Sequence, residues 1–140
     1  MKVVDANVLL YSVNKRSAHH ASARGWLDDA LSGSEAVAFS WLALLSFLRV
    51  STMVTLPRPM PVQAAVRVVE EWLSAEAAVV INPTSRHVGL VGGLLLGAGM
   101  AGNLVNDAHL AALAIEHGGK VVSFDTDFAR FPGLQWQLLR

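Results

Sequence analysis

Cysteine is absent from this chain of 140 residues. Its absence excludes a disulfide framework, zinc sites built on thiolates and a thiol nucleophile. A chain without cysteine also suits a reducing compartment, so we expect the protein to be cytoplasmic.

Charge is scarce as well, since charged residues make up only 16% of the chain and 11 basic residues balance 11 acidic ones. A net charge of zero gives no bulk attraction for nucleic acid, so a partner that carries phosphate would need a metal or local basic residues. Hydrophobic residues make up 53%, which supports a sizeable core and argues against disorder. We therefore expect a single domain over residues 1–140.

No apolar run is long enough for a membrane helix, which needs about 20 residues. The candidate stretch, Val88–Met100, is shorter and rich in glycine. We predict that it forms a closely packed core helix whose glycines let a neighbour approach, and that the protein has no membrane association. Charge within the first apolar run, Met1–Asp5, also argues against a signal peptide.

Short apolar strands alternate with longer helical patterns along the chain. Such alternation is typical of an α/β fold with a short central parallel sheet flanked by helices, a three-layer sandwich. The predicted strands cover residues 3–4, 36–39, 78–81, 120–124 and 136–139. A helical start is predicted at residues 8–11, and longer helices are predicted at residues 17–31, 41–53, 62–73, 85–99 and 107–117.

Three aspartates occupy comparable places in this pattern. Asp5 and Asp125 each follow an apolar strand, and Asp107 lies in the first turn of a helix that Asn106 caps and Gly118 ends. Sites in parallel sheets form at the carboxyl ends of strands, so these acids can meet on one rim. The structural alternatives are a turn for Asp5 and a favourable helix-dipole contact for Asp107.

Carboxylates held close together repel one another unless they are protonated, paired or bound to a cation. No lysine or arginine recurs beside all three acids, so a hard divalent cation such as Mg²⁺ or Mn²⁺ is the natural partner. A metal on an open rim can bind phosphate and activate water, which indicates phosphoester hydrolysis.

Taken together, several segments resemble those of PIN-domain ribonucleases, and most closely the VapC-type toxins of bacterial toxin–antitoxin pairs. The hallmark segments are V-V-D-A-N-V-L-L-Y at residues 3–11, G-N-L-V-N-D-A-H-L-A-A-L-A-I-E-H-G at 102–118 and S-F-D-T-D-F-A-R-F-P-G-L at 123–134, and F-L-R-V-S-T at 47–52 also matches the toxin branch. The resemblance implies a PIN-like sandwich and a Mg²⁺-dependent endoribonuclease acting on RNA. It further implies a cognate antitoxin that folds a segment over the active site, and a homodimer.

By motif position, the resemblance implies that Asp5 and Asp107 are the principal metal ligands and that Asp125 adds a third carboxylate. It also implies a catalytic set that includes Asp127, which assists, Asn7, which orients Asp5, and Ser123, a hydroxyl before the third acid. Either Asp125 or Asp127 alternatively caps the turn that begins at Phe128.

One position departs from the family pattern. Many PIN nucleases carry a glutamate where this chain has Ser46, and a serine supplies no charge to a metal. The number of metals, one or two, therefore stays open, and so does a binding module with a decayed site. The other alternative is a metal-dependent phosphatase that uses an aspartyl phosphate, although Asn7 stands where that chemistry needs a second aspartate.

Overall fold

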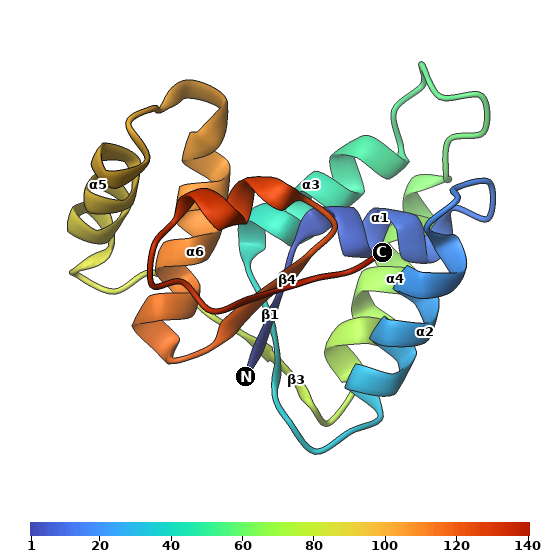
Figure 1. Cartoon of the computed structure of the whole chain (residues 1–140). Helices are drawn as coiled ribbons and strands as arrows, with labels where there is room; N and C mark the ends of the chain where they lie inside the picture. The colour runs from blue at the N-terminus through green and yellow to red at the C-terminus, as the bar shows by residue number, and fades with distance from the viewer.

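Five short parallel strands form the centre of the computed structural model, which describes residues 1–140 (Figure 1). The sheet order is β3-β2-β1-β4-β5, which are Ala78–Val80, Val37–Phe39, Lys2–Val4, Lys120–Ser123 and Trp136–Leu138. The helices are α1 Ala6–Val13, α2 His20–Leu31, α3 Trp41–Ser51, α4 Val62–Ser74, α5 His87–Ala98 and α6 Val105–His117, with two 3₁₀ helices, η1 Gly102–Leu104 and η2 Thr126–Arg130.

Alternating side chains of the strands pack into two cores, one on each face of the sheet. Val4 and Val122 belong to the core that α1, α2, α3 and α4 cover, whereas their neighbours Val3 and Val121 belong to the core that α6 covers. This is the two-residue period expected of strands buried on both faces. Figure 1 shows the two helical layers on either side of the strands, which confirms the three-layer α/β sandwich predicted from the sequence.

The direction in which successive strands are added to the sheet changes at β1. From β1 the chain builds outward through β2 and β3, then returns to the other side of β1 with β4 and β5. The amide of Asp5 donates to the carbonyl of Val122 at 3.0 Å, so the ends of β1 and β4 lie side by side. Ligand sites in open parallel sheets form at such reversals, outside the carboxyl ends of the strands.

Helix α6 brings Asp107 toward this rim, but it begins differently from the prediction. The helix starts at Val105 with Leu104 in the N-cap position, so Asn106 lies inside the first turn and the expectation that it caps the helix is wrong. Because η1 leads directly into α6, the chain already has helical geometry before Asn106. The helix ends at Gly118, whose φ of 69° is a left-handed conformation that favours glycine.

Helix α5 is the largest departure from the prediction, because none of its residues is buried. It packs on α6 through side chains such as Leu94 and Leu95, while Val88 and Leu96 are 82% and 84% exposed. A Cβ placed on its glycines would meet nothing within 4 Å, so no neighbour uses them for close approach. Helix α5 therefore lies in the outer layer and not in the core, where it was predicted. None of the helices has the length and apolar character that a membrane span requires.

Candidate active site

A buried hydroxyl joins the first and last motif segments. Ser123, the final residue of β4, is fully buried, and its Oγ donates to Oδ2 of Asp5 at 2.6 Å. The same Oγ accepts from Nδ2 of Asn7 at 3.0 Å and from the amide of Asp125 at 2.9 Å. Asn7 in turn accepts from the amide of Phe124 through its Oδ1. The orientation of the Asp5 carboxylate is thus fixed by residues from β4 and α1.

Asp5 also makes use of its place at the start of α1. It is the N-cap residue, and its Oδ1 accepts from the amide of Ala6 at 2.7 Å. Both carboxylate oxygens therefore hold one hydrogen bond from the protein and keep lone pairs for a further partner.

Three other carboxylates converge beside Asp5. One oxygen from each of Asp107, Asp125 and Asp127 lies within 4.8 Å of the others. Asp107 comes from the first turn of α6, whereas Asp125 and Asp127 flank the start of η2. Asp125 also caps η2, since its Oδ1 accepts from the amide of Asp127 at 2.9 Å. The structure therefore brings the predicted acids to one rim, and capping by Asp125 coexists with its place in the cluster.

Burial and mutual repulsion raise the pKa of two of the acids, Asp107 and Asp5. Burial, followed by repulsion from Asp125, Asp5 and Asp127, raises the pKa of Asp107 to about 7. Burial also raises the pKa of Asp5, although the hydrogen bonds from Ser123 and Ala6 oppose the shift. Arg130, with Nε at 3.1 Å from Oδ1 of Asp127, is the only cation in an ion pair with any of these acids. The rim therefore concentrates negative charge that the protein leaves largely uncompensated.

A cavity of about 170 Å³ lies between Asp5 and Asp107. Its wall includes Ser40, Ser46 and Asn106. Ser46 on α3, the position where many PIN nucleases carry glutamate, thus faces the acids, and Ser40 caps the same helix by accepting from the amide of Ala43. Ser46 therefore contributes a small neutral side chain to the cavity wall, at the position where many PIN nucleases contribute a carboxylate.

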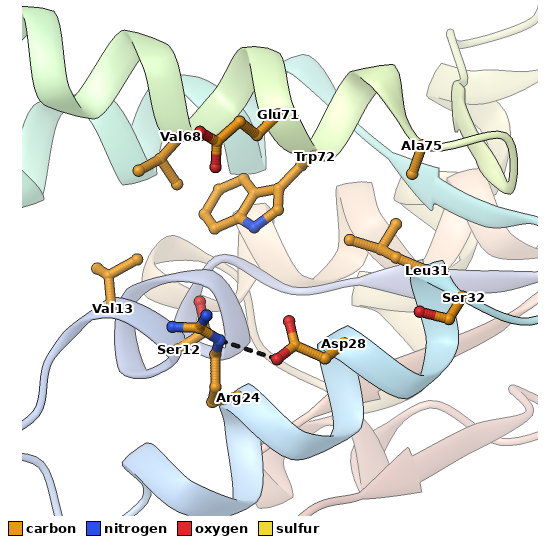
Figure 2. Close-up of a pocket in the computed structure, with 10 residues that line it drawn as sticks. All are labelled: Ser12, Val13, Arg24, Asp28, Leu31, Ser32, Val68, Glu71, Trp72 and Ala75. Atoms are coloured by element: carbon orange, nitrogen blue, oxygen red, sulfur yellow. Dashed lines mark hydrogen bonds and ion pairs between the residues drawn. The ribbon is translucent and has the colours of Figure 1, made fainter.

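A larger cavity, of about 370 Å³, lies elsewhere between α1, α2 and α4 (Figure 2). Figure 2 shows the Trp72 ring and the ion pair of Arg24 with Asp28 in its wall, and none of the rim acids lines it. Because it lacks converging carboxylates, we place the chemistry at the smaller cavity, where the acids lie.

Sequence reasoning missed a polar chain that links α5 to α6. The Glu116 carboxylate, whose side chain is 1% exposed, accepts from the Thr84 hydroxyl at 2.6 Å and from Nδ1 of His87 at 2.9 Å. Nε2 of His87 lies 2.8 Å from Nδ1 of His109. Burial opposes ionisation of Glu116, but these hydrogen bonds outweigh it and lower its pKa. The histidines have no metal-ligand spacing along the chain, and only the fold places them together.

The donor set on the rim fits a hard divalent cation. Carboxylate oxygens are the preferred ligands of Mg²⁺ and Mn²⁺, and neither a thiolate nor an imidazole belongs to the cluster. Burial and then repulsion raise the pKa of Asp107, and a bound cation would relieve the repulsion. Asp107, Asp125 and Asp127 would hold such an ion, with Asp5 beside them.

Comparison with known proteins defines the class to which this fold and site belong. The PIN domain model matches residues 2–134, so the chain belongs to the PIN-domain family. The chain is similar to Ribonuclease VapC37 of Mycobacterium tuberculosis, with 54% identity over 137 residues that cover 97% of this chain and 95% of that protein. Ribonuclease VapC33 of the same species is 37% identical, over 97% of this chain and 96% of its own length.

Solved structures share the fold at low sequence identity. VapBC2 from Rickettsia felis, bound to a DNA fragment from its promoter, aligns with a TM-score of 0.73 and 21% identity over 99% of this chain and 98% of that one. VapC20 of M. tuberculosis, a toxin that cleaves the sarcin-ricin loop, aligns with a TM-score of 0.70 and 19% identity over 96% of each chain. These neighbours confirm the PIN-like sandwich predicted from the sequence.

Proposed function

We propose that this protein is a toxic endoribonuclease of the VapC type, which hydrolyses RNA phosphodiester bonds with a divalent metal. The observation that carries the proposal is the convergence of Asp107, Asp125 and Asp127 within 4.8 Å, beside Asp5, in a chain of the PIN-domain family. The name of the relative at 54% identity, a VapC ribonuclease, supports the same activity. We further propose that it acts in the cytoplasm, in line with an RNA substrate and with a chain that lacks cysteine.

The positions of the rim residues suggest a separate role for each of them. We assign Asp107, Asp125 and Asp127 to the metal because their oxygens already converge. Asp5 contributes a fourth carboxylate, held by Ser123 and Ala6 so that it cannot swing away from the rim. Asn7 and Ser123 act as positioning residues, since they contact Asp5 and the backbone of the Asp125 segment. A bound Mg²⁺ or Mn²⁺ would supply charge stabilisation at the scissile phosphate and lower the pKa of a water.

The decisive experiment is cleavage of structured RNAs, such as tRNA and ribosomal fragments, by purified protein. We expect discrete cuts with Mg²⁺ or Mn²⁺ and none with a chelator. Asp107→Asn should cut about a thousandfold more slowly, because loss of a ligand removes several kcal/mol of transition-state stabilisation. Asp29→Asn, an exposed aspartate on α2, is the matched control and should cut at the normal rate.

Two other results would change the conclusion. Equal cutting by the two variants would mean that a contaminating nuclease is responsible. Metal binding without cleavage of any RNA would favour a binding module with a decayed site, which the neutral Ser46 makes the main competitor. An aspartyl-phosphate intermediate trapped on Asp5 would instead support the alternative of a metal-dependent phosphatase.

We also propose two protein partners. A cognate antitoxin should suppress the cleavage when it is added to the purified protein, in line with VapC relatives and VapBC complexes of the same fold. A second copy of the chain is the other partner, because Val88 and Leu96 leave an apolar surface on α5 of the kind that dimers cover. Sedimentation of the wild type beside Leu96→Glu tests the dimer, which the added charge should weaken.

A further inference from the structure

Arg130 is the one basic residue that forms an ion pair with an acid of the rim. It is the last residue of η2, and its Nε donates to Oδ1 of Asp127 at 3.1 Å, three positions back along the chain. Its side chain is 51% exposed. Because only Nε is used in this ion pair, the two terminal amino groups make no hydrogen bond within the protein.

We propose that Arg130 binds a phosphate of the RNA strand beside the acidic cluster, with Asp127 holding the guanidinium in place. The inference rests on the proposed function and deepens it, because it assigns a substrate contact to the same site. A guanidinium presents a planar fork of N–H donors that matches phosphate, and an Arg whose Nε is fixed keeps its terminal donors for such a ligand.

The negative charge of the rim gives Arg130 a role in binding phosphate. Asp5, Asp107, Asp125 and Asp127 gather on one rim and repel phosphate, and the protein as a whole has no net positive charge to offset them. Arg130 pairs with one of these acids, so a positive charge lies beside the negative region that a phosphate has to approach. A phosphate contact of Arg130 would therefore strengthen RNA binding and help to position the RNA along the site.

The competing explanation is an ordinary surface ion pair. Exposed pairs on helices contribute little to stability, so Arg130 and Asp127 alone do not prove a function. Arg24 offers a matched comparison, since its Nε donates to Oδ2 of Asp28 at 2.9 Å on α2 and its side chain is similarly exposed, at 58%. That pair lies in the wall of the other cavity, away from the rim acids (Figure 2).

The test measures binding of a fluorescent single-stranded RNA by anisotropy, in an Asp107→Asn background, in which slow cutting leaves the RNA intact during the measurement. Arg130→Ala should weaken binding about five- to tenfold at moderate salt, as expected for loss of one charged contact. It should also reduce the slope of log affinity against log salt by about 0.7, the value for one phosphate of a single strand. Arg130→Lys should keep the slope but recover only part of the affinity, because lysine lacks the fork. Arg24→Ala should change neither quantity.

The proposal is overturned if Arg130→Ala binds RNA with unchanged affinity and slope, if Arg24→Ala loses as much, or if no variant binds RNA. A general structural defect is checked by thermal unfolding, where Arg130→Ala should melt with the wild type. Cleavage by the wild type, measured separately, reports on the proposed function. In an otherwise wild-type enzyme that cleaves RNA, Arg130→Ala should raise KM several-fold and leave kcat within about twofold, since the contact holds substrate and transition state alike.

Discussion

Oγ of Ser123 lies 2.6 Å from Oδ2 of Asp5, although 118 positions separate the two residues along the chain. The parallel pairing of β1 with β4 creates this contact, because Val4 and Val122 are in register and the next residues of each strand emerge together. The hydroxyl also accepts from Asn7 and from the amide of Asp125. One buried oxygen thereby couples the position of Asp5 to that of the Asp125 segment.

Removal of this hydroxyl should destabilise the protein. Ser123→Ala leaves the amide of Asp125 and one oxygen of Asp5 without a partner in a buried setting, at a cost of about 1–3 kcal/mol in the free energy of unfolding. It should also raise the pKa of Asp5 further, since the hydrogen bond from Ser123 opposes the effect of burial. Urea unfolding measures the loss. Ser74→Ala removes an exposed hydroxyl that donates to the carbonyl of Glu71 and should cost less than about 0.5 kcal/mol.

Substitution of Asp107 should stabilise the metal-free protein at neutral pH. The pKa of Asp107 is about 7 in the folded protein against 3.8 as its ordinary value, so the folded state binds more protons between these values and stability falls as pH rises through them. Asp107→Asn has no such proton to lose. Its melting temperature in chelator should therefore exceed that of the wild type by an amount that grows from pH 4 to pH 8.

The size of this gain should be modest, because Asp107 is only half-buried and water screens the repulsion. We expect about 1–2 kcal/mol at pH 8, or about 3–6 °C. Asp29→Asn should show no pH-dependent difference. A gain for Asp107→Asn that is constant across pH, or a loss at pH 8, would contradict the predicted origin of the effect.

A carboxylate at position 46 should strengthen metal binding. Ser46 shares a cavity wall with Asp5 and Asp107, so Ser46→Glu places a further anionic oxygen beside the acids. We expect Mn²⁺ to bind about tenfold more tightly by titration calorimetry, because charge count on the ligands tunes affinity for hard cations. Ser32→Glu adds the same charge at the other cavity and should leave Mn²⁺ affinity unchanged. Equal affinity for all three proteins would show that Ser46 is too far from the ion to matter.

The contact of His87 with Glu116 should hold α5 against α6. No residue of α5 is fully buried, so the hydrogen bond of His87 with Glu116 supplements the apolar contacts of Leu94 and Leu95 that pack α5 on α6. In His87→Ala, amide hydrogens of residues 87–98 should exchange faster by mass spectrometry, while those of β1 and β4 keep their protection. His20→Ala removes a contact on α2 with the carbonyl of Tyr11 and should leave α5 exchange unchanged. Unaltered exchange of α5 in His87→Ala would mean that apolar contacts suffice.

The fold was predictable because its signals are local. Short apolar strands and helices of the expected period placed the elements to within a few residues, and Gly118 marked the end of α6. The surroundings of α5 were not predictable, because an apolar, glycine-rich stretch has the same composition whether it lies in a core or on an outer layer. The prediction for Asn106 was wrong because the 3₁₀ helix η1 leads directly into α6, which therefore begins one residue before Asn106.

The candidate site was only partly predictable. Asp5 and Asp125 were predicted from their places after strands and Asp107 from its place in the first turn of a helix, and the motif resemblance added Asn7, Ser123 and Asp127. The sequence could not choose between Asp125 as a cap and Asp125 as a member of the cluster, and the structure shows both arrangements at once. Contacts between distant positions, such as His87 with Glu116 or Ser123 with Asp5, leave no local pattern along the chain.

The sequence by itself determined the class of fold, the PIN-type motifs and the kind of chemistry, since hydrophobic period and residue type act over a few neighbouring positions. Only the tertiary structure decided which oxygens converge, that Ser46 faces the acids, and that Asp127 pairs with Arg130 at the edge of the cluster. The physical reason is that electrostatic repulsion and hydrogen bonding depend on distances of a few ångströms. Those distances are set by strand register and helix packing between segments that are far apart in the chain.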